Sequence, residues 1–177
     1  VASQATTHGE NIVLRILDRQ KGIVPLDGLG LEASQLAMLK KMIARPEGII
    51  LVTGPTGSGK TTTLYAALSK INTSDKNIIT IEDPIEYLFK HKKSIVNQRE
   101  LGTDAKSYHV ALKNALRQAP DVILIGEIRD REAMTMAIAY AQSGHLCVAT
   151  LHANNSYHAL NRIISFFPLE NRTALLQ

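Results

Sequence analysis

The sequence predicts an α/β fold in which a mainly parallel β-sheet is flanked by helices. Short apolar runs alternate along the chain with segments whose apolar residues recur at helical spacing. The runs are continuous instead of alternating with polar residues, as is typical of strands that are buried on both faces of a parallel sheet. In such sheets ligands bind beyond the carboxyl ends of the strands, so residues just after each run are the candidates for function.

The elements follow one another regularly from residue 33. A helix is expected over 33–46, with Ser34 as a candidate N-cap and Pro46 at its end. Four apolar runs are expected to form strands, over 48–53, 77–82, 121–127 and 146–152. Four segments with helical spacing are expected to form further helices, over 60–72, 105–119, 130–144 and 156–167.

The two ends of the chain are harder to interpret. The stretch "NIVLRILD" at 11–18 is apolar and could be a strand or a short helix, while its flanks resemble loops. We expect residues 1–30 to be the end of a preceding N-terminal domain plus a linker. Residues 31–177 are expected to be the core domain with its C-terminal part missing, so that the fold is truncated at both ends.

Composition excludes several classes of protein. The chain has 177 residues, of which 45% are hydrophobic and 20% charged. None of its apolar runs reaches the roughly 20 residues that span a membrane, so no transmembrane segment is expected. Its single cysteine, Cys147, cannot support a disulfide framework, and no zinc site is expected within the chain. The net charge of +4 comes without an arginine-rich stripe interleaved with aromatic residues, so no nucleic-acid partner is expected.

A phosphate-binding loop follows the first predicted strand. The segment "GPTGSGKT" at 54–61 matches G-x-x-x-x-G-K-[ST] in full, with a strand before it and a helix after it. Its glycines let backbone N–H groups point at phosphate oxygens, and the helix adds its positive end. Lys60 would reach the β- and γ-phosphates, and the Thr61 hydroxyl would bind Mg²⁺. A chance glycine-rich turn is the alternative. The candidate phosphate-binding residues are Gly54, Pro55, Thr56, Gly57, Ser58, Gly59, Lys60, Thr61 and Thr62.

Carboxylates end two of the other predicted strands. Glu127 ends the third, where an acid that reaches Mg²⁺ through water belongs. Glu82 and Asp83 end the second, and Glu86 follows shortly after them. Because neighbours in an extended segment point in opposite directions, only one of Glu82 and Asp83 is expected to face a nucleotide. A solvated strand end or a helix cap is the structural alternative for each of these acids.

Two histidines bracket the fourth predicted strand. An extended run holds His145 and His152 about 20 Å apart at roughly 3.3 Å per residue, which excludes one shared metal ion. His152 follows the carboxyl end of the strand, where an imidazole could hydrogen-bond a γ-phosphate. A purely structural role is its alternative. His145 lies at the opposite end and is expected to pack or cap in preference to contacting nucleotide.

Four segments together resemble a known family. "GPTGSGKTTTLYA", "ITIEDPIEY", "LRQAPDVILIGEIRD" and "SGHLCVATLHANN" resemble the Walker A, Asp box, Walker B and His box of the bacterial secretion ATPase superfamily. That superfamily comprises the hexameric motors of type II secretion and type IV pili. The resemblance covers about residues 1–170 and implies a RecA-like P-loop NTPase core.

The resemblance also implies roles for individual residues. Lys60 and Thr61 would bind phosphate and Mg²⁺, and Glu127 would act on the Mg²⁺. Glu82 would be the general base or the acid that positions water, with Asp83 in a supporting role. His152 would sense the γ-phosphate, supported by His145.

Arginines matter in this family because some members direct them at a neighbouring nucleotide site. Arg117 matches one such arginine, although a plain helix-surface arginine is the alternative. Many members carry a second arginine where this chain has Lys113, and lysine keeps the charge but loses the bidentate fork. Arg15 is a candidate for an arginine in the linker from the N-terminal domain.

The implied function is Mg²⁺-dependent ATP hydrolysis that powers type IV pilus assembly or retraction, or type II protein secretion. The implied assembly is a ring-shaped homo-hexamer that works with an inner-membrane platform protein. It would be cytoplasmic and peripheral at that membrane. Assembly-type and retraction-type features are mixed in the sequence. The alternatives are a nucleic-acid motor on a related core, and an inactive nucleotide-binding scaffold, which the presence of Lys60, Thr61, Glu82 and Glu127 disfavours.

Overall fold

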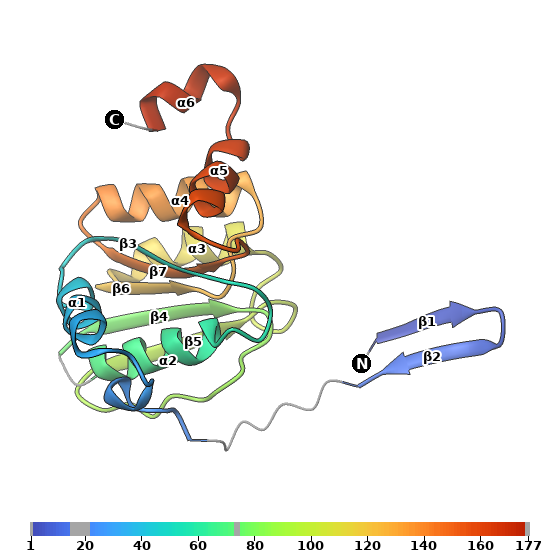
Figure 1. The fold of residues 1–177 in the computed structure, drawn as a ribbon, viewed down its shortest axis with the longest axis horizontal. Coiled ribbons are helices and arrows are strands. Elements are labelled where there is room, and N and C mark those ends of the chain that lie inside the picture. Colours follow the sequence, from blue (N-terminus) through green and yellow to red (C-terminus); the bar gives the residue numbers. More distant parts are fainter. Residues whose placement is uncertain (1, 15–21, 73–74, 176–177) are drawn as a thin grey trace.

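A five-stranded, wholly parallel sheet forms the centre of the molecule. The structure is a computed structural model that describes residues 2–14, 22–72 and 75–175. The strands are β3 (Gly48–Thr53), β4 (Asn77–Glu82), β5 (Ile95–Glu100), β6 (Val122–Ile125) and β7 (Leu146–Leu151). They lie in the order β3-β7-β6-β4-β5, and every neighbouring pair is parallel. The predicted α/β fold is therefore confirmed (Figure 1).

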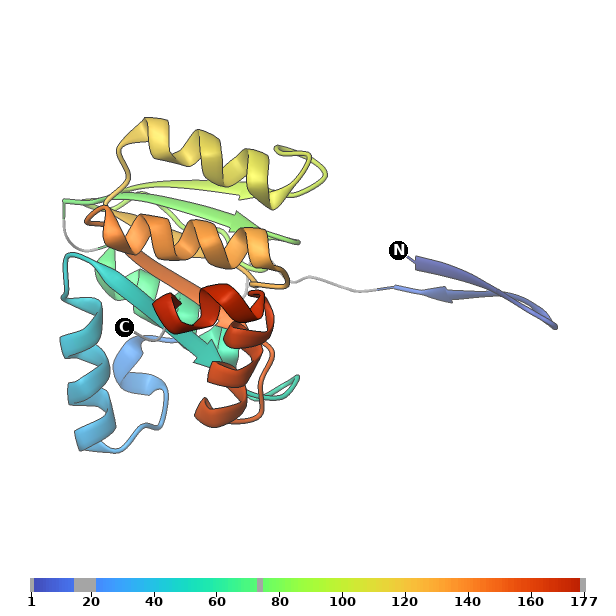
Figure 2. The ribbon, with the colours of Figure 1, turned by 90° about the horizontal axis from the view of Figure 1, so that it is seen from above.

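Helices cover both faces of this sheet. The helices that the structure describes are η1 (Leu26–Gly28), α1 (Ala33–Ile43), α2 (Lys60–Ile71), α3 (Tyr108–Ala115), η2 (Leu116–Gln118), α4 (Arg131–Gln142), α5 (Ser156–Ser165) and α6 (Leu169–Leu175). One apolar cluster joins the sheet to α3, α4 and α5, and a second joins it to η1, α1 and α2. Figures 1 and 2 show this layered arrangement.

The two clusters explain why the apolar runs are continuous. In β4, Ile79 and Ile81 belong to the first cluster, while Ile78 belongs to the second. All three side chains are 0% exposed. Burial of an isoleucine side chain contributes about 1.5–3 kcal/mol, so both faces of each central strand favour apolar residues. Of the five strands, only β5 lacks such a run, and only one of its six residues, Val96, is fully buried.

Several predicted boundaries are wrong. No strand was expected at β5, because its sequence, IVNQRE, is mostly polar. The α1 helix begins after Glu32, whose side chain forms a capping box with Gln35, so Ser34 is not the N-cap. The helix predicted over 105–119 begins only at Tyr108, after the Ser107 cap. The α-helix ends at Ala115 and continues as the 3-10 helix η2, after which Ala119 has a left-handed backbone conformation. The strand predicted over 121–127 is limited to β6.

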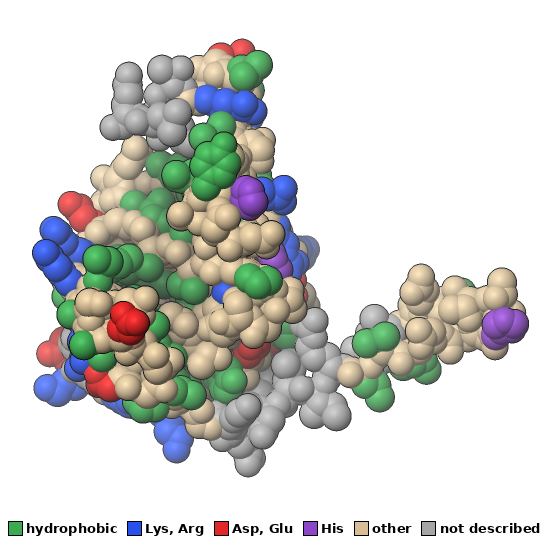
Figure 3. Space-filling view, in the orientation of Figure 1, with side chains coloured by type: hydrophobic (Ala, Val, Ile, Leu, Met, Phe, Trp, Pro, Cys, Tyr) green, Lys and Arg blue, Asp and Glu red, His purple; other side chains and the backbone are tan. Residues whose placement is uncertain are grey.

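An antiparallel hairpin of β1 (Ala2–Thr6) and β2 (Gly9–Val13) lies apart from the sheet in both ribbon views (Figures 1 and 2). The apolar stretch 11–18 thus begins in a strand, and its residues from 15 onward lie outside the described part. Ile12, Val13 and Leu14 are 58–67% exposed. Figure 3 shows apolar side chains along this hairpin. The division at residue 30 stays a prediction. Among the described helices, none is long and apolar enough to cross a membrane.

Candidate active site

A cavity of about 630 Å³ opens at the carboxyl ends of the central strands. The loop after β3, the end of β4, the segment after β6 and the end of β7 all contribute to its lining. Parallel strands bring these segments to one edge of the sheet, although they are far apart in sequence. The edge predicted to carry function is therefore the edge that encloses the cavity.

The phosphate-binding loop forms one wall. Gly59, with φ of 88°, precedes α2 and offers no side chain to cap it, so N–H groups of the first turn remain available. By contrast, Asp130 and Asn155 cap α4 and α5 with their side chains. A helix N-terminus of this kind favours an anion. The sequence-predicted loop residues that line the cavity are Thr56, Gly57, Gly59, Lys60, Thr61 and Thr62.

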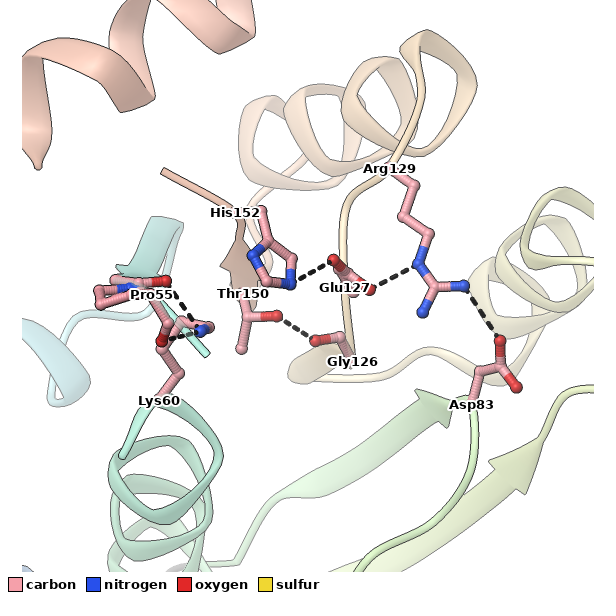
Figure 4. Close-up of polar contacts among 9 residues, drawn as sticks. Pro55, Lys60, Asp83, Gly126, Glu127, Arg129, Thr150 and His152 are labelled. Carbon is pink, nitrogen blue, oxygen red and sulfur yellow. Dashed lines mark hydrogen bonds and ion pairs between the residues drawn. The ribbon is translucent and has the colours of Figure 1, made fainter. Parts of the chain in front are cut away.

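The other predicted loop residues support this wall from behind. The Lys60 ammonium donates hydrogen bonds of 2.8 Å to the carbonyl oxygens of Gly54 and Pro55 (Figure 4). Gly54 has φ of 152°, and a Cβ atom there would lie 2.5 Å from Ser58 Oγ. Glycine is thus required at 54, where the loop packs against its own Ser58. Lys60 is held at the loop by carbonyl groups that a phosphate could replace as its partner.

Glu82 is a buried carboxylate at the end of β4. Its side chain accepts hydrogen bonds from the Tyr65 hydroxyl, from Thr80 Oγ1 at 2.6 Å and from Gln98 Nε2 at 3.3 Å. The residue is only 3% exposed, yet it lines the cavity. Burial disfavours the charged form and raises the pKa of Glu82, although the three donors oppose this effect. Such an environment brings a carboxylic acid closer to the working range of a base at neutral pH.

Asp83 also lines the cavity, so both acids adjoin it, and the expectation that only one of Glu82 and Asp83 faces a nucleotide stays a prediction. The alternation rule applies within a strand, but β4 ends at Glu82 and Asp83 lies beyond it. Asp83 Oδ2 accepts a hydrogen bond of 3.2 Å from Arg129 Nη1. The two acids therefore have different environments, one buried among neutral donors and one paired with a cation. Glu86 lines the cavity as well.

Glu127 lies between two nitrogen-bearing side chains. Arg129 Nε donates to Glu127 Oε2 at 2.5 Å, and His152 Nε2 lies 3.2 Å from Oε1. With the Asp83 contact, these residues form a row of linked polar side chains that line the cavity: Asp83, Arg129, Glu127 and His152 (Figure 4). Thr150 Oγ1 donates to the Gly126 carbonyl at 2.5 Å, which holds the end of β7 against the segment after β6.

The cavity offers oxygen ligands that suit Mg²⁺. The Thr61 hydroxyl and the Glu127 carboxylate both line it, and Mg²⁺ prefers such hard oxygen donors. Within the described ranges, no group of three or more histidine, cysteine, aspartate or glutamate side chains is placed to hold a metal ion. Protein Mg²⁺ sites commonly use one or two side chains plus substrate phosphates and water. The residues present therefore fit a cation that binds together with a nucleotide.

Other predicted residues lie away from this cavity. His145 precedes β7 at the opposite end of the sheet, where its ring packs edge-on against Tyr140 and Nδ1 lies 3.1 Å from Ser143 Oγ. It packs locally, as expected from the residues, and the supporting role toward His152 stays a prediction. Arg117 is exposed in η2 and is not among the described residues that line the cavity. Arg15 lies outside the described part of the chain.

Sequence reasoning missed four residues that shape the site. Thr80 could have been found, because it lies two positions before Glu82 and so on the same face of the strand. Arg129 follows Glu127 by two positions, but nothing in the spacing pairs it with Asp83. Tyr65 and Gln98 reach Glu82 from α2 and from the unpredicted β5, and these contacts depend on the tertiary fold.

Comparisons with known proteins agree on one family. The sequence model of the family described as "Type II/IV secretion system protein" matches residues 1–170. The chain is 51% identical to the type IV pilus ATPase PilU of Pseudomonas aeruginosa, covering 90% of this chain and 41% of PilU. It is 46% identical to type II secretion system protein E of Xanthomonas campestris pv. campestris, covering 93% of this chain and 28% of that protein.

Solved structures give the same result. The chain superposes on the pilus retraction motor PilT with bound ADP at a TM-score of 0.86 and 46% identity, covering 98% of this chain and 49% of that one. The Legionella pneumophila ATPase DotB matches at a TM-score of 0.77 and 29% identity, covering 85% of this chain and 42% of DotB. The chain therefore spans less than half the length of each of these relatives.

Proposed function

Because the chain belongs to the type II/IV secretion system protein family, we propose that it hydrolyses ATP with Mg²⁺ as one subunit of a ring-shaped motor. The motor would power type IV pilus assembly or retraction, or type II protein secretion. The observation that carries this proposal is the meeting of Lys60, Thr61, Glu82 and Glu127 in one cavity. The similarity to PilU, to type II secretion system protein E and to an ADP-bound PilT supports ATP as the substrate. It also supports pilus movement or protein secretion as the process that hydrolysis powers.

The loop wall binds the nucleotide. Backbone N–H groups of the loop and of the first turn of α2 would hold the phosphates, and Lys60 would exchange its carbonyl partners for β- and γ-phosphate oxygens. Thr61 and Glu127 would hold Mg²⁺, Glu127 through water. When bound, Mg²⁺ would neutralise the negative charge that develops on the phosphate oxygens.

Glu82 is proposed to activate the attacking water. Its two oxygens offer about four lone-pair positions, of which Thr80 and Gln98 take two on Oε1 and Tyr65 takes one on Oε2. One position on Oε2 remains for a water proton. As the water oxygen bonds to the γ-phosphorus, the bond to the ADP oxygen breaks and Glu82 accepts the proton. A pKa raised by burial makes this carboxylate a better base.

His152 is proposed to report the γ-phosphate. Its side chain is 57% exposed and contacts Glu127, so it can exchange that contact for a phosphate oxygen without leaving a buried group unpaired. Loss of the phosphate would return it to Glu127. The same carboxylate would thereby link the sensor to the Mg²⁺ site.

The assembly of the whole protein is part of the proposal. We place it as a homo-hexamer at the cytoplasmic face of the inner membrane, held there by a platform protein. Arg117, exposed in η2, would point at the nucleotide of a neighbouring subunit, and Arg15 would act from the linker. Residues 1–30 would end an N-terminal domain and 31–177 would form the nucleotide-binding core.

Lysine substitution tests the proposed activity. In the full-length protein, Lys60→Ala should lose nucleotide binding and release of phosphate from Mg²⁺-ATP, since the loop then lacks its charge for the phosphates. Lys41→Ala, which changes an exposed lysine of α1, is the matched control and should keep both. Undiminished phosphate release by Lys60→Ala would overturn the assignment of this cavity as the ATPase site.

A further inference from the structure

The row of linked polar side chains in the cavity contains one arginine, Arg129, that the proposed reaction does not use. Arg129 donates to Glu127 at 2.5 Å and to Asp83 at 3.2 Å, so it joins the segment after β6 to the end of β4. Hydrogen bonds between arginine and carboxylate are charge-assisted and are among the stronger ones in proteins. Arg129 thus holds the carboxylate that the proposed function assigns to Mg²⁺.

The Glu127 carboxylate cannot bind a cation and keep both of its present side-chain contacts unchanged. Arg129 engages Oε2 and His152 contacts Oε1, so both oxygens have a partner in this structure. A cation that approaches Glu127 therefore competes with these partners for the same two oxygens. A divalent ion bound there would also lie close to the guanidinium charge and would be repelled by it.

Asp83 is a second carboxylate partner for Arg129. Its carboxylate already binds the Nη1 end of the guanidinium, while Glu127 binds the Nε edge. If Glu127 turns to a cation, Arg129 keeps one charged partner. When a cation replaces Arg129 at Glu127, neither Glu127 nor Arg129 is left without a partner of opposite charge. The Arg129 side chain is 55% exposed, so it can move during this exchange.

We propose that Arg129 competes with the divalent cation for Glu127, and so lowers the affinity of the site for metal until nucleotide phosphates help to bind it. Arg129 is on this account a positioning residue that acts through Glu127. The inference rests on the proposed function, since it needs a metal bound beside the nucleotide. On this proposal, Glu127 binds either the Arg129 guanidinium or the divalent cation.

A double-mutant cycle on metal binding tests this without turnover. The dissociation constant of Mn²⁺ for the ADP complex of the full-length protein would be measured by electron paramagnetic resonance. Arg129→Gln should bind Mn²⁺ about two- to fivefold more tightly, the range for a partly exposed ion pair. Arg131→Gln removes a charge two residues away, from an arginine that stacks over Phe167, and should leave the constant unchanged.

The second half of the cycle separates competition from simple charge repulsion. In a Glu127→Gln background, Arg129→Gln should give a clearly smaller gain in Mn²⁺ affinity, because the shared carboxylate is gone and only the direct repulsion by the guanidinium charge is removed. An equal gain in both backgrounds, or weaker binding in Arg129→Gln alone, would overturn competition through Glu127. If the wild-type protein bound ADP but held no Mn²⁺ with it, the Mg²⁺ part of the proposed function would fall too. If Mn²⁺ bound but the cycle showed no coupling, only the inference about Arg129 would fall.

Discussion

The hydroxyl of Tyr65 donates a hydrogen bond to the buried carboxylate of Glu82. This contact ties α2, the helix that begins at the phosphate-binding loop, to the end of β4. The Tyr65 ring also stacks on Phe89 with centroids 5.1 Å apart and meets Tyr87 edge-on at 5.0 Å. The aromatic contacts fix the ring, and the ring fixes the orientation of the proposed base.

Removal of the Tyr65 hydroxyl should lower the stability of the folded protein. Tyr65→Phe keeps the ring but takes one donor from a buried carboxylate, so the free energy of unfolding should fall by about 1–3 kcal/mol. Denaturant unfolding measures this loss. Tyr157→Phe, at a side chain that is 68% exposed, is the control and should change stability little. Equal stability of the two variants would show that the Tyr65–Glu82 bond contributes nothing.

The buried carboxylate should also make stability depend on pH. Burial raises the pKa of Glu82 in the folded state, so above its unfolded pKa the folded protein binds more protons than the unfolded one. Stability therefore falls as pH rises through this range, and the cost is complete above the folded pKa. Glu82→Gln removes the charge, so its melting temperature should rise relative to wild type as the pH increases above the unfolded pKa of a glutamate. Glu170→Gln, an exposed glutamate of α6, should show no such trend.

Gly54 should tolerate no side chain. Gly54→Ala places a Cβ atom 2.5 Å from Ser58 Oγ at φ of 152°, so the loop must shift and nucleotide affinity should fall at least tenfold. Fluorescent ATP-analogue binding measures the loss. The double variant Gly54→Ala/Ser58→Gly removes the atom that clashes and should recover part of the affinity. No recovery at all would assign the whole effect to the backbone angle.

Much of the fold was predictable because the central strands are buried on both faces. Continuous apolar runs such as 77–82 mark these strands, and the full P-loop motif placed the first wall of the site. Strand β5 escaped prediction because most of its side chains are at least partly exposed, so its sequence, IVNQRE, contains no continuous apolar run. Gln98 could not be assigned to the site for the same reason, since its role depends on that strand lying beside β4.

The ion pairs of the site were beyond sequence reasoning for a different reason. Glu127 and Asp83 were candidates because each follows a strand, but which cation pairs with them depends on side-chain reach across the sheet edge. Arg129 bridges the two acids from a loop whose path no periodicity predicts. These contacts therefore depend on how the side chains pack once the fold has formed, which the spacing of residues along the strands does not encode.

Arg117 provides a test of the proposed ring. If it acts on a neighbouring nucleotide, full-length Arg117→Gln should lose turnover by at least tenfold and keep nucleotide binding. Rings mixed from Arg117→Gln and Glu82→Gln subunits should regain activity, because some interfaces then pair an intact Arg117 with an intact Glu82. Phosphate release from the mixture measures this recovery. Absence of any recovery in rings shown to be mixed would contradict action between subunits.

Glu82 itself tests the central claim, that this cavity hydrolyses ATP with a buried carboxylate as the base. The decisive measurement is single-turnover cleavage of ATP by full-length Glu82→Gln beside wild type, with nucleotide binding measured on the same samples. We predict near-normal ATP affinity and a cleavage rate lower by at least a hundredfold, as expected for loss of a general base. Cleavage at the wild-type rate with normal binding would contradict it.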